Sequence, residues 1–277
     1  MIDIRQTEEY ASYLEKIGWI VVRKNGANYF IKKIPIIGSV IKIQRPQQFN
    51  NLTIQQLFDK YHAFQIIIEP NLTTDYKRLT TTGYKLSNSP YLPTKTLQLD
   101  LTKSEKELFG QLSKDCRYSI RKAMKYKLST GNSEIEKFRY TWTKAVGWKR
   151  YIPPLDHLTA LEKSFIKNVL FLMSAGLPRR NEVTAGAIFL IGDKTAYYWQ
   201  AFTNPEGRSA LIQYRIVWEG IKWAKKLGAR VFDFEGVYDE RFPNKSWLGF
   251  THFKKSFGGR EVSYPGAYIK NFIPKLI

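Results

Sequence analysis

Two groups of residues near the C-terminal end of the sequence could do chemistry. Asp233 and Glu235 lie in an apolar Phe-Asp-Phe-Glu-Gly segment that is typical of a buried strand. Further on, Phe253, Lys254 and Lys255 form a short element with aromatic anchors on both sides. Carboxylates can bind or move protons, and an ammonium group can stabilise a developing negative charge. By residue type alone, we expect Asp233 to be structural and the two lysines to be surface residues.

Several common catalytic patterns are missing from the sequence. No Gly-x-Gly occurs, so there is no dinucleotide-binding fingerprint, and neither a Walker A loop nor a Gly-x-Ser-x-Gly elbow is present. The glycine-containing loop with which ordinary acetyltransferases hold the pyrophosphate of coenzyme A is missing as well. These absences argue against a dehydrogenase, a kinase or a hydrolase.

Metal and disulfide chemistry have little support in the sequence. The single cysteine, Cys116, excludes an internal disulfide and a cysteine-rich zinc site. The three histidines, His62, His157 and His252, are scattered without the spacing of metal ligands. We therefore expect no metal site and no bound cofactor.

The chain is strongly basic. Its net charge is +20, from 44 lysines and arginines against 24 aspartates and glutamates, and its pI is near 9.8. Such an excess attracts a polyanion, either a nucleic acid or an anionic membrane face, although a merely solvated basic surface is the alternative. The N-terminus lacks the apolar stretch of a signal peptide, and no apolar run approaches the ~20 residues of a membrane span. We expect a soluble, cytoplasmic protein, with peripheral contact with the inner membrane face as an option.

The first part of the chain alternates helices with apolar strands, which favours an α/β domain. The predicted elements are a helix over 7–16 capped by Thr7, strands over 19–22, 28–34 and 39–43, a helix over 53–61 and a strand over 64–69. Asn25 and Gly26 predict a tight turn between the first two strands. The stretch 73–93 is rich in Thr, Asn, Gly and Pro and is expected to be irregular.

A strand over 96–101 leads into a long predicted helix that is capped by Thr102. One face of this helix is an apolar stripe made of Leu108, Leu112, Cys116, Ile120 and Met124. An adjacent face carries the cations Lys114, Arg117, Arg121 and Lys125. We interpret the basic face as a phosphate-binding surface, with a solvated helix face as the alternative.

The rest of the chain repeats this organisation. The pattern predicts mainly helix over 133–171, strands over 183–191 and 195–203 joined by a turn after Gly192, a helix over 209–227 and a strand over 230–234. The order helix, hairpin, helix and strand is similar to that of the first half. We therefore predict two related α/β domains.

Four segments, in the same order along the chain, resemble the Fem family of aminoacyl-tRNA-dependent peptidyltransferases. The first is the strand from residue 96 with the basic helix from residue 117, and the second is the pair of strands from residues 183 and 195. The third is the stretch 211–237, and the fourth is Phe-Lys-Lys-Ser-Phe-Gly-Gly from residue 253. The resemblance covers residues 96–268 and is weaker before them. It implies an α/β (α+β) fold of two GNAT-like domains, with mixed sheets flanked by helices and no coiled-coil arm. The first domain would span 1–95, completed by 260–277, and the second would span 96–259.

The resemblance also implies an activity. An aminoacyltransferase of this family moves an amino acid from aminoacyl-tRNA to a stem-peptide amine of a peptidoglycan precursor, which is UDP-linked or lipid-linked. The amine attacks the ester carbonyl, and a cation can stabilise the oxyanion that forms. Lys254 matches the family's catalytic lysine, and Phe253 would pack near the terminal adenosine of the tRNA. A general base is not evident in the sequence.

Further site residues follow from the same resemblance. Lys16 and Arg150 are the nearest matches for the lysine and arginine that hold the acceptor's phosphates, and Tyr151 would supply an aromatic ring. Lys16 could equally complement the dipole at the end of its own helix. The expected tRNA-binding surface consists of Lys114, Arg117, Arg121, Lys125 and Lys255.

Two alternatives remain open from the sequence. One is a GNAT-type acyltransferase with another donor, or with a protein N-terminus as acceptor. The other is a non-catalytic RNA-binding module. The placement of Lys254 next to Phe253 argues against the module, because binding alone needs positive charge but no fixed Phe-Lys pair.

Overall fold

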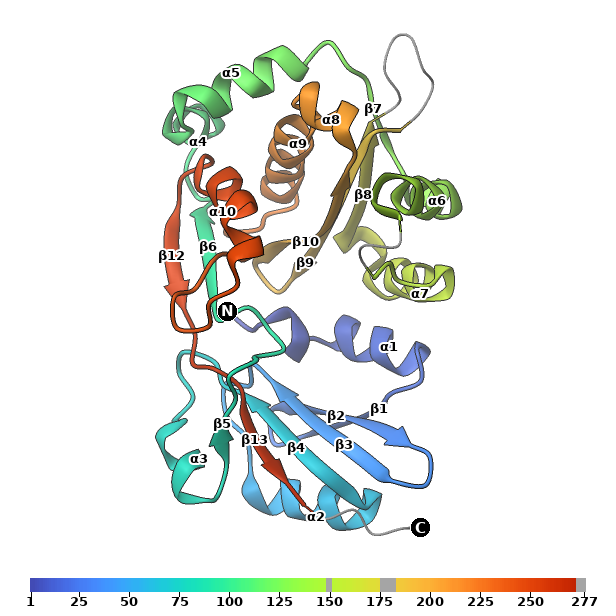
Figure 1. Cartoon of the computed structure of the whole chain (residues 1–277), viewed down its shortest axis with the longest axis vertical. Helices are drawn as coiled ribbons and strands as arrows, with labels where there is room; N and C mark the ends of the chain where they lie inside the picture. The colour runs from blue at the N-terminus through green and yellow to red at the C-terminus, as the bar shows by residue number, and fades with distance from the viewer. Residues whose placement is uncertain (148–150, 175–182, 273–277) are drawn as a thin grey trace.

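A computed structural model describes residues 1–147, 151–174 and 183–272 of the chain. It contains two mixed sheets that lie one above the other along the long axis of the molecule, each flanked by helices (Figure 1). In each sheet a single pair of neighbouring strands is parallel, β3 (Gly38–Gln44) with β4 (Ala63–Glu69) and β10 (Thr195–Thr203) with β11 (Val231–Gly236). The predicted mixed α/β class, with two sheets flanked by helices, is confirmed.

The first sheet has six strands in the order β1-β2-β3-β4-β13-β5. Its further elements are a 3-10 helix (Ile4–Gln6), α1 (Glu8–Lys16), β1 (Ile20–Lys24), β2 (Ala27–Ile34), α2 (Asn51–Tyr61), α3 (Lys77–Thr81), β5 (Lys85–Leu86) and β13 (Tyr268–Asn271). As predicted, the side chain of Thr7 caps α1 by accepting a hydrogen bond from the backbone of Tyr10. Asn25 and Gly26 both have positive φ angles, of 53° and 73°, and form the predicted turn between β1 and β2.

The second sheet has seven strands in the order β12-β6-β11-β10-β9-β8-β7. Its strands are β6 (Lys95–Asp100), β7 (Leu128–Thr130), β8 (Val169–Ser174), β9 (Ala185–Gly192) and β12 (Arg260–Ser263), together with β10 and β11. Its helices are α4 (Glu105–Gln111), α5 (Lys114–Ala123), α6 (Ile135–Val146), α7 (Leu155–Phe165), α8 (Pro205–Ser209), α9 (Ile212–Lys226) and α10 (Leu248–Lys255).

The single long helix predicted after Thr102 is wrong, because the structure has two helices there. Leu112 adopts an extended conformation, and Ser113 starts α5 by accepting a hydrogen bond from the backbone of Cys116. A serine that can cap a new helix makes the break favourable at this point. The predicted apolar stripe is buried as far as Ile120, whereas Met124 lies beyond the end of α5 and is exposed.

The predicted return of the chain to the first domain from residue 260 onward needs a correction. β12 pairs with β6 and extends the second sheet, and only β13 pairs with β4 in the first sheet. The edge strand β6 has a free side that β12 can occupy before the chain crosses over. In Figure 1 the red strand β13 accordingly lies among the strands of the first sheet. The division of the chain into domains near residue 95 stays a prediction.

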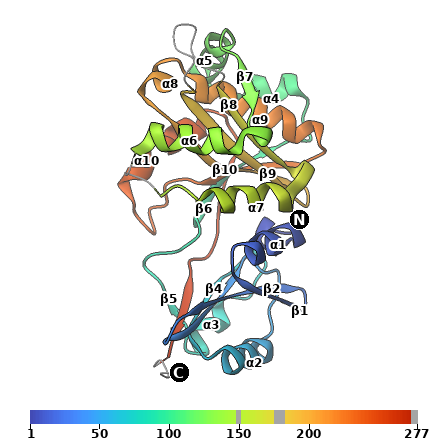
Figure 2. The same ribbon diagram turned by 90° about the vertical axis from the view of Figure 1, so that its right-hand side faces the viewer.

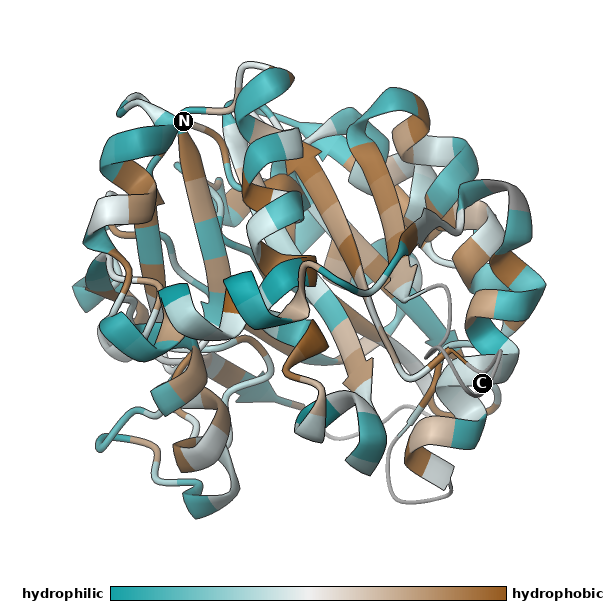
Figure 3. Ribbon diagram, turned by 90° about the horizontal axis from the view of Figure 1, so that it is seen from above, coloured by the Kyte–Doolittle hydropathy of each residue, from teal (hydrophilic) through white to brown (hydrophobic). Residues whose placement is uncertain are grey.

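The second sheet has apolar cores on both of its faces. Along β9, Phe189 points into the core under α9, whereas its neighbour Leu190 points into the core under α6 and α7. Figure 2 shows α6 and α7 crossing one face of this sheet, with α1 below α7. Figure 3 shows the apolar residues concentrated on the central strands and on the inner sides of the helices.

Helix α1 connects the two sheets physically. Its residues Tyr10 and Leu14 join an apolar cluster with Leu158 and Leu161 of α7, and Phe30 of β2 belongs to the same cluster. The N-terminal segment therefore packs against both sheets, which places its side chains at the junction between them.

Candidate active site at the junction of the two sheets

The strands β10 and β11 separate before they end. They pair in parallel at three positions, from Thr195 opposite Val231 to Tyr197 opposite Asp233. Beyond these positions both strands continue, but they no longer pair with each other. β11 also shifts its register with β6 between Asp233 and Gly236. β6 pairs with β11 again at Gly236, so it is on the side facing β10 that the end of β11 lacks a partner strand.

Lys254 of α10 reaches this opening. Its Nζ donates a hydrogen bond of 2.6 Å to the carbonyl oxygen of Gly236, and it lies 5.0 Å from the ring centre of Phe250 and 5.8 Å from that of Tyr198. The residue is 9% exposed. Burial lowers the pKa of Lys254 to about 8, although the charges of Glu235 and Asp233 act in the opposite direction. The structure therefore holds an ammonium group of lowered pKa at the point where the two strands part.

The neighbours of Lys254 have different surroundings. Phe253 packs against Tyr214 and Phe257, with ring centres 4.8 Å and 5.4 Å away, so its ring anchors α10 to the core of the second sheet. Lys255 forms an ion pair of 2.6 Å with Glu261 of β12. The charge of Lys255 is therefore partly neutralised by Glu261. The placement of Phe253 near the terminal adenosine of a tRNA stays a prediction.

Asp233 is buried in a dense hydrogen-bond network. Its carboxyl group accepts from the backbone of Glu235 at 2.7 Å and from the amide of Gln98 at 2.9 Å. The hydroxyl of Thr96 contacts both Asp233 and the carbonyl oxygen of Glu235. One hydroxyl proton cannot serve two acceptors, so a protonated Asp233 that donates to Thr96 satisfies the network best. Burial, reinforced by the charge of Glu235, accordingly raises the pKa of Asp233 to about 7.

The variant Asp233→Asn is expected to flatten the dependence of stability on pH between 3.8 and about 7, the ordinary and the raised pKa of this group. In that window the folded state binds a proton that the unfolded state has lost, so the free energy of unfolding falls as the pH rises. Asparagine does not titrate and removes this contribution. Denaturant unfolding of both proteins across the window measures it, and parallel curves would show that Asp233 is ionised in the folded protein.

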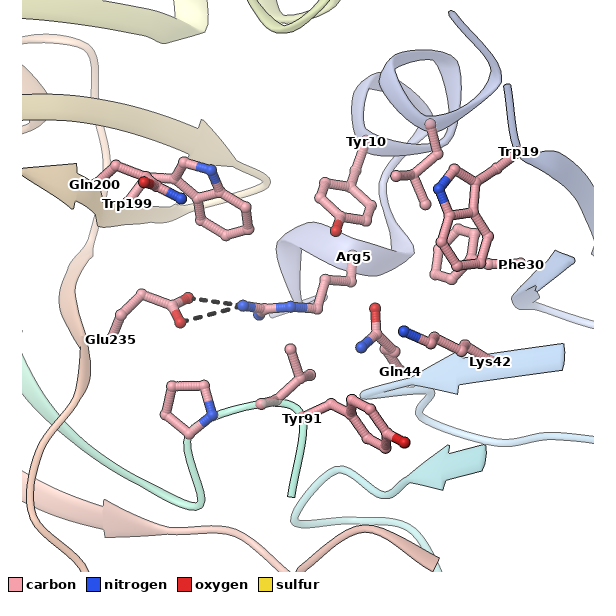
Figure 4. Close-up of a pocket in the computed structure, with 13 residues that line it drawn as sticks. Arg5, Tyr10, Trp19, Phe30, Lys42, Gln44, Tyr91, Trp199, Gln200 and Glu235 are labelled. Atoms are coloured by element: carbon pink, nitrogen blue, oxygen red, sulfur yellow. Dashed lines mark hydrogen bonds and ion pairs between the residues drawn. The ribbon is translucent and has the colours of Figure 1, made fainter. Parts of the chain in front are cut away.

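Glu235 points from the end of β11 toward the N-terminal segment. Nη2 of Arg5 lies 3.1 Å from both carboxylate oxygens of Glu235 (Figure 4). Nη1 of Arg5 lies 3.2 Å from Asp3. Although burial lowers it, the charges of Glu235 and Asp3 keep the pKa of Arg5 well above its ordinary value. This ion pair joins residues that are 230 positions apart in the sequence.

A cavity of about 390 Å³ opens between the two sheets beside this ion pair. Its wall contains the aromatic rings of Tyr10, Trp19, Phe30, Tyr91 and Trp199 (Figure 4). Its charged lining residues are Arg5, Lys42 and Glu235, and Leu14, Gln44, Leu92, Pro93 and Gln200 complete the wall. A cavity that combines aromatic walls with a few charged groups is typical of a binding site for a small polar ligand.

Lys42 of β3 is the cation on the side of the cavity away from Glu235 (Figure 4). Its Nζ lies 5.4 Å from the ring centre of Trp19 and 4.8 Å from that of Tyr91. Burial lowers the pKa of Lys42, and the charge of Glu69 opposes this effect. A partly desolvated ammonium between two rings is well placed to bind an anionic group of a ligand.

A second cavity of about 400 Å³ shares the segment 91–93 with the first. Aromatic side chains of Tyr238, Phe242 and Trp247 line it, and its one charged lining residue, Asp239, is paired with Arg241 at 2.7 Å. Trp247 packs so closely on Gly236 that a Cβ atom there would overlap with the indole ring. The two cavities therefore flank the strand end that carries Glu235 and Gly236.

The structure does not bring the residues predicted to bind the acceptor into either cavity. Lys16 lies exposed at the end of α1, where its Nζ donates to Ser12 at 2.6 Å. Tyr151 is 74% exposed and does not line the described cavities, and Arg150 lies outside the described residues. Lys42 is the lysine that does line a cavity, the one beside the Arg5–Glu235 ion pair. Its signal in the sequence was a lysine between two isoleucines of a predicted strand.

The predicted basic face is smaller than the sequence suggested. The guanidinium of Arg117 donates to the carbonyl oxygens of Gly110 and Leu112 and thereby ties α5 to α4. Lys114, Arg121 and Lys125 are exposed on and just beyond α5, with Arg121 over a phenylalanine ring. Three of the four predicted cations are therefore available to a ligand.

Two kinds of feature are not found in the described part of the chain. Residues 1–147, 151–174 and 183–272 contain no group of three or more histidines, cysteines or carboxylates that could hold a metal ion. Within the same residues, no helix has both the length and the apolar character that crossing a bilayer requires.

Residues 162–276 match the model of the FemAB family. The fold is similar to the crystal structure of FemX, with a TM-score of 0.75 and 15% identity over 98% of this chain and 92% of that chain. No curated protein has a matching sequence.

Two other solved structures share the fold. One is the C-terminal domain of a putative lysylphosphatidylglycerol synthetase from Agrobacterium fabrum, with a TM-score of 0.60 and 11% identity over 97% of this chain and 89% of that one. The other is a tandem GNAT protein from the clavulanic acid biosynthesis pathway, with a TM-score of 0.59 and 10% identity over 92% of this chain and 82% of that one. The resemblance to the Fem family and the fold of two GNAT-like units are thus confirmed.

Proposed function

We propose that this chain, whose residues 162–276 carry the sequence pattern of the FemAB family, transfers an amino acid from an aminoacyl-tRNA to the amine of a peptidoglycan stem peptide. The observation that supports this most strongly is the buried Lys254, held on the carbonyl of Gly236 where β10 and β11 part. This lysine matches the family's Phe-Lys pair.

Lys254 suits the electrophilic half of such a reaction. When an amine attacks the ester of the donor, negative charge develops on the carbonyl oxygen, and a cation in a site of low dielectric stabilises that charge far more than water does. Lys254 has one hydrogen bond to a backbone oxygen and keeps two further N–H groups for a ligand. In this proposal it donates one of them to the oxyanion.

The cavity beside the Arg5–Glu235 ion pair suits the acceptor. A peptidoglycan precursor carries carboxylates and phosphates as well as a free amine, and Lys42 offers a partly desolvated cation for one of the anionic groups. The aromatic rings of Trp19 and Tyr91 lie close to Lys42 and would flank that contact. We propose Lys42, rather than Lys16, as the acceptor's phosphate- or carboxylate-binding residue.

The exposed cations on α5 suit the tRNA backbone. Replacing Lys114, Arg121 and Lys125 together by alanine is expected to weaken tRNA binding and to make the plot of log affinity against log salt shallower by about 0.7–0.9 for each phosphate that the protein no longer neutralises. Titrations at several salt concentrations measure this slope. Arg117→Ala is the matched control, expected to keep the slope and to lower the free energy of unfolding by about 1 kcal/mol, since its guanidinium holds two backbone carbonyls. Equal slopes in the triple variant and the wild type would remove α5 from the tRNA-binding surface.

The reaction itself can be tested directly. Purified protein is incubated with a pool of tRNA charged with radiolabelled amino acids and with UDP-linked or lipid-linked stem pentapeptide, and label in the precursor is counted. Transfer to one of the two precursors is the expected result, and it also identifies the acceptor. If label moves only to protein N-termini, the chain is an acyltransferase with another acceptor. Tight tRNA binding without any transfer would favour the RNA-binding module.

A further inference from the structure

Glu235 is the one carboxylate among the described residues that line the cavity beside the Arg5–Glu235 ion pair. Its side chain is 16% exposed, so it can be reached from the cavity, and the rest of the wall consists of aromatic, apolar, amide and cationic side chains. A cavity of this composition has a single position that attracts a positively charged group of a ligand.

The backbone holds Glu235 in an unusual conformation. Its φ angle is +58°, in the left-handed region that residues other than glycine seldom adopt. This backbone conformation costs on the order of 1 kcal/mol. Hydrogen bonds on both sides fix this conformation, from the backbone N–H of Glu235 to Asp233 and from Lys254 to the carbonyl of Gly236. The turn directs the carboxylate away from the sheet and toward the cavity (Figure 4).

Arg5 leaves Glu235 able to accept more hydrogen bonds. A single nitrogen of Arg5, Nη2, lies 3.1 Å from both oxygens, whereas an ionised carboxylate offers about four acceptor positions. Arg5 forms its ion pairs with Glu235 and Asp3 and not with Asp233.

We infer that Glu235 binds the ammonium group of the acceptor, which is a primary amine. This inference rests on the proposed function and extends it to the nucleophile. Because Glu235 and Gly236 are consecutive, an amine on Glu235 lies beside the point where Lys254 contacts the strand end. The nucleophile and the cation that stabilises the oxyanion are thus brought together by adjacent residues of one strand.

The protons balance in this arrangement. The bound ammonium gives one proton to the carboxylate of Glu235, which later releases it to solvent. The free amine then attacks the ester carbonyl carbon, so that a C–N bond forms and the carbonyl oxygen becomes an oxyanion beside Lys254. When the C–O bond to the ribose breaks, a second proton passes from the nitrogen to the leaving ribose oxygen, and an amide remains.

The test measures binding alone, so its result does not depend on whether transfer occurs. The probes are a short stem-type peptide with a lysine side chain and the same peptide acetylated on its lysine nitrogen, titrated calorimetrically into the protein without tRNA. The wild type is expected to bind the free amine at least about tenfold more tightly, which is the size of a hydrogen bond to a charged group. Equal affinity of the wild type for the two peptides would overturn the inference, whether or not the protein transfers amino acids.

Two variants assign the preference to a residue. Glu235→Gln keeps the shape of the side chain and is expected to bind both peptides equally. Glu240→Gln is the matched control, because Glu240 is a carboxylate of the following loop, is 79% exposed and does not line the cavity. It should keep the wild-type preference. A Glu235→Gln protein that folds, as shown by circular dichroism, and still prefers the free amine would contradict the assignment.

Discussion

The variant Lys254→Met is expected to lower aminoacyl transfer by about 10²–10³-fold while the protein stays folded. Removing one donor from an oxyanion site has an effect of this size, since the donor acts in a water-excluded position. Methionine fills a similar volume and removes a buried charge, so the fold should not suffer. Single-turnover transfer assays on charged tRNA measure the rate, and Lys255→Met, next along the helix and paired with Glu261, is the control. A variant with wild-type rate would exclude Lys254 from the chemistry.

The same lysine predicts a dependence on pH. Transfer that needs the Lys254 ammonium should decline as the pH rises through about 8, and this limb of the profile should be missing from the residual activity of Lys254→Met. The effect on stability has a defined sign as well. Between about 8 and the ordinary 10.5 the unfolded state binds the proton that the folded state has lost, so the contribution of Lys254 to the free energy of unfolding rises with pH there.

The variant Arg5→Met is expected to lower the free energy of unfolding by about 3–5 kcal/mol. It removes one partner of a buried ion pair and leaves Glu235 and Asp3 without their cation in surroundings of low dielectric. Because Arg5 belongs to the N-terminal segment and Glu235 to the second sheet, the contact between the two sheets should weaken too. Urea unfolding followed by circular dichroism measures the change.

The control for Arg5 is an exposed pair of the same residue types. Arg23 lies 3.3 Å from Glu8, but its side chain is 41% exposed and that of Glu8 is 89% exposed, so Arg23→Met should change the free energy of unfolding by less than about 1 kcal/mol. If Arg5→Met were as mild as Arg23→Met, water would have to solvate the junction between the sheets far better than its burial indicates.

Local chemistry in the sequence predicted the features that depend on neighbouring residues. Thr7 caps α1, and Asn25 with Gly26 forms the turn after β1, because the side chain or backbone preference responsible lies within a few positions of the result. The turn between β9 and β10 was predictable for the same reason. Lys254 was identified by its place after Phe253 in a short motif, which needs no knowledge of distant residues.

Local rules also failed where two of them competed. The apolar spacing from Leu108 to Ile120 is that of one helix, yet the capping preference of Ser113 divides it into α4 and α5. Arg117 then became a link between the two helices instead of a free cation. Periodicity shows which side chains are buried, but it does not show whether the backbone between them is continuous.

The sequence alone determined the class of the fold, the family resemblance and the lysine proposed to be catalytic, because each of these is written in short segments. The tertiary structure decided which side chains surround that lysine. Arg5 pairs with Glu235, which is 230 positions away in the sequence, and Lys42 of β3 lines the same cavity. No local sequence pattern specifies that these three residues come together. β12 joins the second sheet and β13 joins the first. This assignment also depends on which strand edges are free once both sheets have formed.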